Sequence, residues 1–431
     1  MSSTRRRTFL KSFASGAAAL SIPPSAWGAQ RTINVALIGC GGRGRGVMET
    51  FLQAPGVRVT HVCDPWKTRL ERAAKEAGSG VKLESDLRRV LDDRSVDAVI
   101  VATPDHWHSP ASILACDAGK HVYVEKPCSH NLREGRLLVE AARRNKRLVQ
   151  HGTQVRSTST IIEAVKLLRS GVIGNVFAAK AWNIQRRGSI GHDEPSTPPP
   201  DLDYDAWVGP APMIPYQKNR VDREWNWWFH FGVGDMGNDG VHDLEIVRWG
   251  LGVETHPSTI AALGGKYFFE DDQQFPDTQQ VTFEYPGDGR PGSRRMLIYE
   301  QRLWATNPPR GLDSGTEFYG TKGQLFVSRR GKFEMLGEDN QPVNVDIPLE
   351  SQNTTKHVAN FLAAIRGTEP LNAEIKLGHL TSSLAHLGNV AVRLGRSLKF
   401  DPRTEHVLDD DEADRMMGRK YRSHWGTPRV G

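Results

Sequence analysis

Before residue 153 the chain alternates short apolar runs with segments whose apolar positions recur at helical spacing. Short apolar runs bounded by polar or glycine-containing segments are typical of strands buried on both faces. Repeated strand–helix units predict an α/β domain wound on both sides of a parallel sheet. The expected strands are 32–38, 57–63, 81–83, 97–102, 121–125 and 147–152. One helix is expected to begin at residue 47, and three more are expected over 86–91, 110–118 and 132–144.

The pattern changes after Thr153, where alternating apolar positions predict strands and a proline-rich segment, 193–203, predicts a loop. A chain of this length is too long for one ordinary core. We therefore expect a domain over 29–153 and a second over 154–431, the latter ending in a charged tail. In the second, the expected helices are 159–170, 357–366 and 377–394, the expected strands are 175–184, 280–285, 295–301 and 316–319, and a hairpin turn is expected at 320–325.

A glycine-rich turn follows the first expected strand directly. Gly39, Gly41 and Gly44 satisfy a G-x-G-x-x-G spacing, which permits close backbone approach and presents helix N–H groups to a pyrophosphate. Asp64 ends the next strand, where an acid accepts from an adenosine ribose and repels a 2′-phosphate. We predict a dinucleotide site in which NAD is favoured over NADP, although nearby basic residues act against that choice. Its residues in this half are Gly39, Gly41, Gly42, Arg43, Gly44 and Asp64.

Two later strands end in polar residues at the sheet edge. Thr103-Pro104 follows the fourth expected strand, and the fifth ends in Glu125-Lys126-Pro127. In an open parallel sheet the ligand lies beyond the carboxyl ends of the strands, so these residues are expected to point at it. Lys126 is the first candidate for a catalytic group.

These motifs, with Ala118-Gly119-Lys120-His121-Val122 between them and His108 five residues beyond Thr103, resemble the Gfo/Idh/MocA oxidoreductase family, which includes glucose–fructose oxidoreductase and inositol dehydrogenase. The resemblance implies a Rossmann domain and an α+β domain with an open, mainly antiparallel sheet. That sheet's outer face is the family's usual dimer surface, so we expect a homo-oligomer. The resemblance also implies that Lys126 lies beside the nicotinamide and that Glu125 helps to hold the cofactor. An ammonium group there stabilises developing alkoxide.

His106 and His108 flank Trp107 in what we expect to be a loop. Two histidines so close suggest a metal, but no carboxylate or cysteine lies at ligand spacing. We therefore predict no metal site. His108 is expected to order the loop beside the cofactor, and Thr103 and Pro104 are counted with it as cofactor-binding residues.

The segment Asn238-Asp239-Gly240-Val241-His242 falls where the family has a D-x-G-x-H sequence just before a helix. The family's histidine takes the proton from the hydroxyl being oxidised, and His242 matches it. Asn238, however, stands where the aspartate belongs, and an amide cannot share charge with an imidazolium. Asp239 or Asp243 could compensate, and both stay open. The resemblance thus gives Lys126, His242 and Asn238 as the candidate catalytic residues.

The substrate side is expected in the second domain. Trp225, Trp227 and Trp228 lie within four residues of one another. Aromatic faces stack on sugars, and tryptophan also fills cores, so both roles stay open. The candidate substrate residues are Arg156, Arg220, Trp225, Trp228, Asp239 and Asp243.

Residues 1–28 have the pattern of an export signal. Arg6-Arg7-Thr8-Phe9-Leu10-Lys11 precedes an uncharged segment and small residues up to Gly28, and this order resembles a twin-arginine signal. Because that pathway carries folded proteins, often with a cofactor already bound, we expect a periplasmic or secreted enzyme with tightly held NAD.

Without the signal's four Lys and Arg the chain has 52 basic and 50 acidic residues, a formal charge of +2 in place of +6. This balance does not indicate nucleic acid or an anionic membrane as a partner. No other apolar run approaches the roughly 18 residues that a membrane span requires.

The four cysteines, Cys40, Cys63, Cys116 and Cys128, all lie in the first third of the chain without C-x-x-C spacing. They form neither a disulfide framework nor a zinc site. We expect free, half-buried thiols, with a bridge between Cys40 and Cys63 left open because their strands are expected to be neighbours.

Three functions compete. The first is an NAD-dependent oxidoreductase that acts on a sugar, cyclitol or glycoside. The second resembles the α-N-acetylgalactosaminidase-like branch of the same superfamily, in which bound NAD oxidises the sugar transiently, permits elimination of the glycosidic bond and is restored. The third is a sugar-binding protein without turnover, suggested by Asn238.

Overall fold

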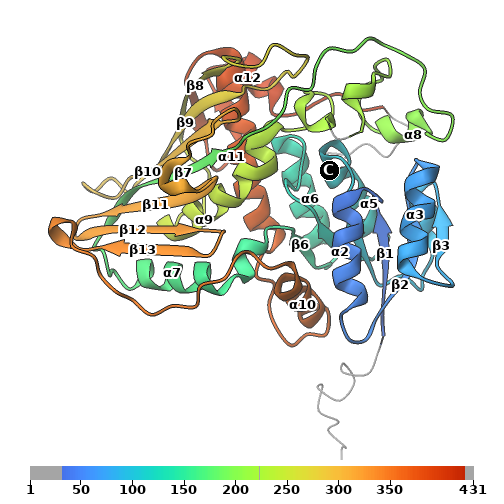
Figure 1. Ribbon diagram of the computed structural model, residues 1–431, viewed down its shortest axis with the longest axis horizontal. Coiled ribbons are helices and arrows are strands. Elements are labelled where there is room, and N and C mark those ends of the chain that lie inside the picture. The colour runs from blue at the N-terminus through green and yellow to red at the C-terminus, as the bar shows by residue number, and fades with distance from the viewer. Residues whose placement is uncertain (1–31, 223, 423–431) are drawn as a thin grey trace, which may run out of the picture. The chain divides into compact units, whose positions relative to one another are not determined.

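The computed structural model describes residues 32–222 and 224–422, and the expected export signal lies outside them. The earlier part of the described chain contains a six-stranded parallel sheet with the order β3-β2-β1-β4-β5-β6 (Figure 1). The predicted parallel α/β domain is therefore confirmed. The strand order reverses between β1 and β4, and ligands bind in the crevice beyond such a point. The strands are β1 (Ile33–Ile38), β2 (Val57–Cys63), β3 (Lys82–Glu84), β4 (Ala98–Val101), β5 (His121–Val124) and β6 (Val149–His151).

Helices cover both faces of this sheet because its strands are apolar on both sides. One face packs against α2, α3 and α10, and the other against α4, α5 and α6. Since α10 comes from late in the chain, Val358, Phe361 and Leu362 complete a core that the first domain begins. The helices are α2 (Gly42–Leu52), α3 (Lys67–Ala77), α4 (Leu87–Asp92), α5 (Asp105–Asp117), α6 (Leu132–Arg144) and α10 (Thr354–Ile365).

The later part of the chain contains a nine-stranded sheet with the order β13-β12-β11-β7-β10-β9-β8-β14-β15. All of its neighbouring strands pair antiparallel except β7 and β10, which run parallel, so the expected mainly antiparallel sheet is confirmed. The strands are β7 (Val176–Ile184), β8 (Thr259–Gly265), β9 (Thr278–Tyr285), β10 (Arg295–Arg302), β11 (Ser314–Gly320), β12 (Gly323–Ser328), β13 (Lys332–Leu336), β14 (Leu398–Asp401) and β15 (His406–Leu408).

One face of this second sheet packs against α7, α9 and α11 in the largest apolar cluster (Figure 1). A π-helix, Met236–Gly240, leads directly into α9 and contains Asn238. Its wider turn changes the direction of the side chains just before α9, and such insertions are frequent at functional sites. The remaining helices are α7 (Ser159–Arg169), α8 (Tyr204–Val208), α9 (Val241–Leu251), α11 (Ile375–Leu394) and α12 (Asp411–Met416).

Several local expectations were wrong. Helix α5 begins at Asp105, so His106, Trp107 and His108 lie on a helix, where a loop was expected. The helix that was expected from Pro110 therefore begins five residues earlier, and Pro110 lies inside it. Helix α2 likewise starts at Gly42, within the glycine motif, and the expected tail contains β15 and α12.

The four cysteines are free thiols, as expected, but they are fully buried and not half-buried. No disulfide joins Cys40 and Cys63, and the Cys40 thiol lies 3.5 Å from the carbonyl oxygen of Cys63. Within the part of the chain that the structure describes, no helix is long and apolar enough to cross a bilayer.

Candidate active site

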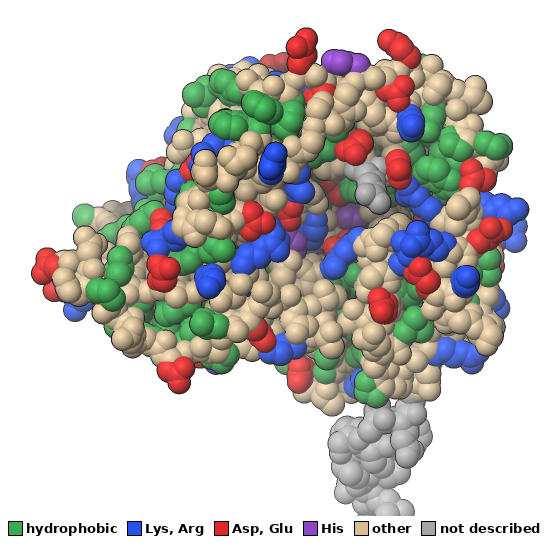
Figure 2. Space-filling model, viewed as in Figure 1, with side chains coloured by type: hydrophobic (Ala, Val, Ile, Leu, Met, Phe, Trp, Pro, Cys, Tyr) green, Lys and Arg blue, Asp and Glu red, His purple; other side chains and the backbone are tan. Residues whose placement is uncertain are grey.

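A cleft of about 660 Å³ lies beyond the carboxyl ends of the parallel strands. Figure 2 shows this face of the molecule hollowed, with basic and acidic side chains around the opening. Most lining residues come from the turns after β1, β2, β4 and β5, and the second domain adds Trp207, Trp225 and Asn238. The cleft therefore lies at the predicted edge. The predicted residues that line it are Gly39, Gly41, Gly42, Arg43, Asp64, Thr103, Pro104, His108, Glu125, Lys126, Trp225 and Asn238.

The glycine turn leaves no room for side chains at two of its positions. Gly39 has φ +96°, and a Cβ there would lie 2.6 Å from the backbone of Ala102 and Thr103. A Cβ on Gly44 would lie 2.0 Å from the carbonyl oxygen of Gly39. Gly44 thus does not line the cleft but allows α2 to pack against the turn. Gly41 and Gly42 are open, so backbone N–H groups at the start of α2 are accessible to an anion.

Asp64 is buried at the end of β2 and anchors the glycine turn. Its Oδ2 accepts from the backbone N–H of Cys40 at 2.7 Å, and its Oδ1 accepts from that of Trp66 at 2.8 Å. Burial raises the pKa of Asp64, and the two backbone hydrogen bonds act against that rise. Each carboxylate oxygen can accept more than one hydrogen bond, so Asp64 keeps capacity for a ribose hydroxyl.

Glu125 is buried and joins two walls of the cleft. The Nε of Arg43 lies 2.8 Å and its Nη2 2.7 Å from Glu125 Oε1. Burial alone would raise the pKa of Glu125, but the charge and hydrogen bond of Arg43 hold it below its ordinary value. The pair fixes the glycine turn to the strand end that bears Lys126.

His108 links the turns after β4 and β5. Its Nδ1 lies 2.6 Å from the carbonyl oxygen of Pro127, and its Nε2 lies 2.8 Å from that of Thr103. Burial lowers the pKa of His108, and its hydrogen bonds to the two backbone carbonyls act against that decrease. This contact gives His108 the ordering position expected from the sequence.

Lys126 reaches across the cleft to the π-helix. Its Nζ donates to Asn238 Oδ1 at 2.8 Å and to the Asn238 carbonyl oxygen at 2.7 Å. The Asn238 amide in turn donates to Asp235 Oδ1 at 3.0 Å. Asp235 is fully buried, and sequence reasoning did not single it out. The carboxylate that position 238 lacks is therefore present one turn earlier, joined to Lys126 through the amide.

His242 lies behind Asn238 on the first turn of α9. It is buried, and within the described residues its Nδ1 has no hydrogen-bond partner. Burial lowers the pKa of His242, and the positive charges of Arg329 and Lys126 lower it further, while Asp239 acts in the opposite direction. Burial therefore favours the neutral imidazole. His242 is not among the residues that line the cleft.

The two aspartates beside His242 have different surroundings. Asp239 is partly exposed, contacts Arg187 and accepts from Arg329 at 3.0 Å. Burial alone would raise the pKa of Asp239, but Arg329, Lys126 and Arg187 hold it well below its ordinary value. Asp243 is buried, accepts from Ser314 Oγ at 2.6 Å, and has its pKa raised to about 7 by burial. Asp239 is thus the ionised aspartate beside the histidine.

Two family models match nearly all of this chain. One describes the oxidoreductase family's NAD-binding Rossmann fold and matches residues 33–153. The other describes the family's C-terminal alpha/beta domain and matches residues 153–287 and 320–427. The chain belongs to the Gfo/Idh/MocA oxidoreductase family.

Curated members of the Gfo/Idh/MocA family match parts of the chain. Inositol 2-dehydrogenase 2 of Saccharopolyspora erythraea is 31% identical over 230 residues, 53% of this chain and 56% of that protein. A glycosyl hydrolase family 109 protein of the same organism is 34% identical over 169 residues, 36% of each chain. The scyllo-inositol 2-dehydrogenase (NAD(+)) of Bacillus subtilis is 27% identical and covers 63% of this chain and 67% of its own. The matches thus span about one to two thirds of these relatives.

Solved structures of the family share the fold. The WlbA dehydrogenase of Bordetella pertussis, in complex with NADH and UDP-GlcNAcA, has a TM-score of 0.65 at 17% identity and covers 86% of this chain and 99% of its own. A levoglucosan dehydrogenase in complex with NADH has a TM-score of 0.66 at 17% identity and covers 85% and 98%. At this identity the similarity shows the fold alone.

Five of the six expected substrate residues are not among those that line the cleft, namely Arg156, Arg220, Trp228, Asp239 and Asp243. Arg156 is buried, pairs with Glu245 in the core and stacks over Trp249, so its position does not support substrate binding. Arg220 stacks over Trp228, whose indole donates to a backbone carbonyl. Burial and internal bonding give these side chains structural roles. Of the nearby tryptophans, Trp225 lines the cleft.

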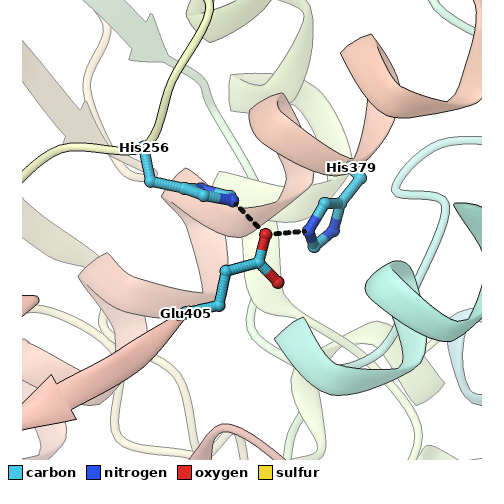
Figure 3. Close-up of side chains that lie close together, drawn as sticks. All are labelled: His256, His379 and Glu405. Atoms are coloured by element: carbon cyan, nitrogen blue, oxygen red, sulfur yellow. Dashed lines mark hydrogen bonds and ion pairs between the residues drawn. The ribbon is translucent and has the colours of Figure 1, made fainter. Parts of the chain in front are cut away.

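One group of buried ligand-type side chains lies outside the cleft, at His256, His379 and Glu405 (Figure 3). The Nε2 atoms of His256 and His379 lie 2.8 Å and 3.1 Å from Glu405 Oε1. Arg136 also pairs with this carboxylate. The arginine balances the carboxylate's charge without an ion, so we interpret the group as a structural junction between α6, α11 and the β14–β15 turn.

Proposed function

We propose that this protein is an NAD-dependent oxidoreductase that transfers a hydride between a hydroxyl-bearing carbon of a sugar, cyclitol or glycoside and bound nicotinamide. The observation that carries the proposal is Lys126, fixed by Asn238 at the mouth of a cleft with an accessible glycine turn. When bound, NAD supplies the hydride acceptor. The residues that would hold it are the turn from Gly39 to Gly42, Asp64 and Glu125.

Lys126 would act on the substrate oxygen. An ammonium group beside a hydroxyl lowers its pKa and stabilises the charge that develops as the carbon is oxidised. Two of the ammonium's three N–H donors are used by Asn238, and the third stays free for the substrate. Because Asp235 orients the Asn238 amide, it is the positioning residue for Lys126.

His242 would receive the hydroxyl proton. Burial favours its neutral form, and among the described residues its Nδ1 has no hydrogen-bond partner. Asp239 is the nearby charge that favours the imidazolium, and Arg187 and Arg329 keep it ionised. The geometry therefore distributes the role of the family's aspartate between Asp235, which orients Lys126, and Asp239, which faces His242.

The nucleotide end of the cleft supports tight binding of NAD. A strap from the second domain, residues 199–222, crosses the Asp64 end of the cleft and is tied to the Rossmann domain. The Lys67 N–H donates to the Asp201 carbonyl at 2.9 Å, the Trp66 indole donates to Asp201 Oδ2 at 3.0 Å, and Arg69 pairs with Asp222. Replacing Asp201 with Ala should raise the fraction of NAD lost on dialysis, whereas Asp193→Ala, in the preceding loop, should not.

NAD is favoured over NADP because the Asp64 carboxylate at the ribose position would repel a 2′-phosphate. The basic groups close by are already engaged. Arg69 lies over the Trp66 ring and pairs with Asp222, and Arg45 pairs with Glu76. These pairs leave little free positive charge for a 2′-phosphate.

We also propose export of the folded enzyme and self-association. The twin-arginine pattern in residues 4–28 supports a periplasmic or secreted location. Large apolar side chains are exposed on and beside the uncovered face of the nine-stranded sheet, which supports a homo-oligomer through that face. They are Phe177, Leu263, Tyr267, Phe268 and Met296.

A second candidate is glycoside hydrolysis by transient oxidation and elimination. It is supported by the similarity to a glycosyl hydrolase family 109 protein and by the export pattern, because an exported enzyme cannot readily exchange NAD with the cytoplasm. The same Lys126 and His242 would serve both reactions, since both begin with oxidation of a hydroxyl. The difference lies in whether reduced cofactor accumulates.

The test uses purified mature protein. The protein is denatured, the released nucleotide is identified, and native protein is screened with sugars, cyclitols and glycosides for absorbance at the reduced-nicotinamide wavelength and for free sugar. Stoichiometric NADH supports the oxidoreductase, and free sugar without net NADH supports the hydrolase. Absence of a bound nucleotide, with none gained on titration, would refute both. Lys126→Ala should abolish turnover while nucleotide is retained, and equal turnover would refute the assigned role.

A further inference from the structure

A second cavity, of about 460 Å³, is lined in part by the Phe229–Val233 segment, which does not line the cofactor cleft. The two hollows share no lining residue. Its walls come from the turn before α6, the 229–233 segment, the C-terminal half of α11, and α12 with the residues that follow it. The cavity is therefore built from parts of both domains but is separate from the proposed reaction site.

Basic groups dominate its wall. Arg393, Arg415 and Arg419 line it, and within residues 32–222 and 224–422 none of them forms an ion pair with a carboxylate. Glu412 is the acid on the rim, and it is already paired with Arg396. The cavity therefore has an excess of positive charge.

Two of these arginines are held in place by neighbours that leave donors free. The guanidinium of Arg393 lies 3.7 Å from the centre of the Phe229 ring, a contact that uses its face and leaves its N–H edge available. Arg419 donates to His130 Nδ1 at 3.1 Å, but its buried Nε has no partner among the described residues. Glu134 lies near Arg419, yet its oxygens accept from Tyr421 and from the His130 N–H.

Asn389, which lines the cavity, also carries one unused acceptor. Asn389, on α11, is nine-tenths buried and donates to the Val233 carbonyl at 2.8 Å. Its Oδ1 is buried and, among the described residues, accepts no hydrogen bond. A buried carbonyl of this kind costs free energy unless a donor reaches it. A ligand that satisfies the whole wall therefore needs an anion for the arginines and a hydroxyl for Asn389.

We propose that this cavity binds a monosaccharide-sized sugar acid, with its carboxylate on the arginines and a hydroxyl on Asn389. The planar fork of a guanidinium matches a carboxylate in two-bond geometry. A simple inorganic anion would leave the Asn389 oxygen unsatisfied, and a neutral sugar would leave the arginines unpaired. The site lies outside the proposed reaction centre and does not depend on the reaction assigned to it.

The electrostatics of the neighbouring histidines offer a spectroscopic readout. Burial lowers the pKa values of His130 and His230, and the charge of Arg419 lowers both further. A bound carboxylate would offset that charge and raise both pKa values toward their ordinary range. The imidazole NMR signals should therefore move with the sugar acid, and those of His121, which faces Arg147 elsewhere, should not.

The test is calorimetric titration of the mature holoenzyme with sodium D-glucuronate, D-glucose and sodium sulfate. We expect glucuronate to bind at least about tenfold more tightly than either other probe, and to weaken as salt rises. Arg393→Gln and Asn389→Leu should each weaken glucuronate by about tenfold. Arg403→Gln, at an exposed arginine outside the cavity whose nearest carboxylate is Asp401, is the matched control and should bind as the wild type does.

Binding that is unchanged in Arg393→Gln, or equally tight for glucose, would overturn the proposal. Equal affinity for sulfate would overturn the sugar acid and leave an anion site only. Lys126→Ala separates the two sites: unchanged glucuronate affinity supports the second cavity, and loss of binding would assign the ligand to the cofactor cleft. Should Asn389→Leu fold poorly, Arg415→Gln replaces it, because Arg415 is exposed at the rim.

Discussion

Replacing Asp235 with Asn tests the arrangement that distinguishes this active site. Asp235 is fully buried and accepts from Asn183 at 2.8 Å, from Arg187 at 3.0 Å and from Asn238 at 3.0 Å. An asparagine has the same shape but turns one of these accepting atoms into a donor. At least one neighbouring N–H then faces another N–H.

The magnitude follows from those contacts. The variant loses the charge of a buried pair with Arg187 and leaves at least one buried donor unpaired. Each hydrogen bond to a charged group contributes roughly 1.5–3 kcal/mol, so about 3–5 kcal/mol of stability should be lost. The catalytic effect should be smaller. A less firmly held Asn238 amide should lower kcat/KM by about 10- to 100-fold, because Lys126 loses its fixed acceptor while its charge remains.

Kinetics on the substrate found by the glycoside screen, together with urea unfolding, measure both effects. Asp271→Asn is the matched control, because Asp271 is a buried acid that accepts from the Ile190 N–H at 2.9 Å and from Lys266 at 2.7 Å, away from Lys126. It should lose stability without a comparable loss of kcat/KM. Wild-type kcat/KM in Asp235→Asn, or an equal loss in Asp271→Asn, would refute the positioning role.

Three further outcomes are expected. Gly44→Ala places a Cβ 2.0 Å from a carbonyl oxygen, so the amount of NAD that stays bound through gel filtration should fall at least about tenfold. Gly46→Ala, whose Cβ would have nothing within 4 Å, should keep the wild-type amount. Glu405→Gln should lower the free energy of unfolding in urea by about 2–3 kcal/mol, because it leaves the partly exposed Arg136 unpaired. An unchanged free energy of unfolding would contradict the structural role of the junction. The free energy of unfolding should also fall as pH drops from about 6.5 to 4. In that range the histidines of the unfolded chain take up protons, whereas those of the folded protein are kept neutral by burial. A free energy of unfolding that does not change with pH would contradict this explanation. The histidines whose pKa values burial lowers to about 3 or 4 are His106, His121, His151, His357, His379 and His386.

The parallel sheet and its ligand edge could be predicted because their signals are local. An apolar run followed by glycines or by Glu-Lys-Pro needs no distant partner to be interpreted, and the cleft lies where those signals placed it. The residues at which helices begin were less predictable. The helix expected over 110–118 in fact starts at Asp105, and Pro110 lies inside it, just beyond its first turn. Strands β8 and β14 were not expected from the sequence, and they pair with each other across more than 130 residues as well as with the next strands, β9 and β15.

The substrate side was less predictable because its residues act through tertiary contacts. Arg156 and Asp239 are both charged residues near expected helix starts, and nothing in their local sequence shows that one pairs with Glu245 in the core and the other faces His242. Asp235 was missed for the same reason. Its carboxylate accepts from the Asn238 amide across the first turn of the π-helix, and from Asn183 and Arg187, which are about 50 residues away in the sequence.

Asn238 looked like a loss of catalytic charge when only the sequence was considered, and the contacts around it give a different meaning. An aspartate at 238 would bring a second carboxylate to within about 3 Å of Asp235, and two such groups cannot both ionise at that distance. With Asp235 already buried and paired with Arg187, an amide is the side chain that can accept from Lys126 and donate to Asp235 at once. The substitution at 238 and the acid at 235 therefore form one arrangement, in which the charge is kept and only its position has changed.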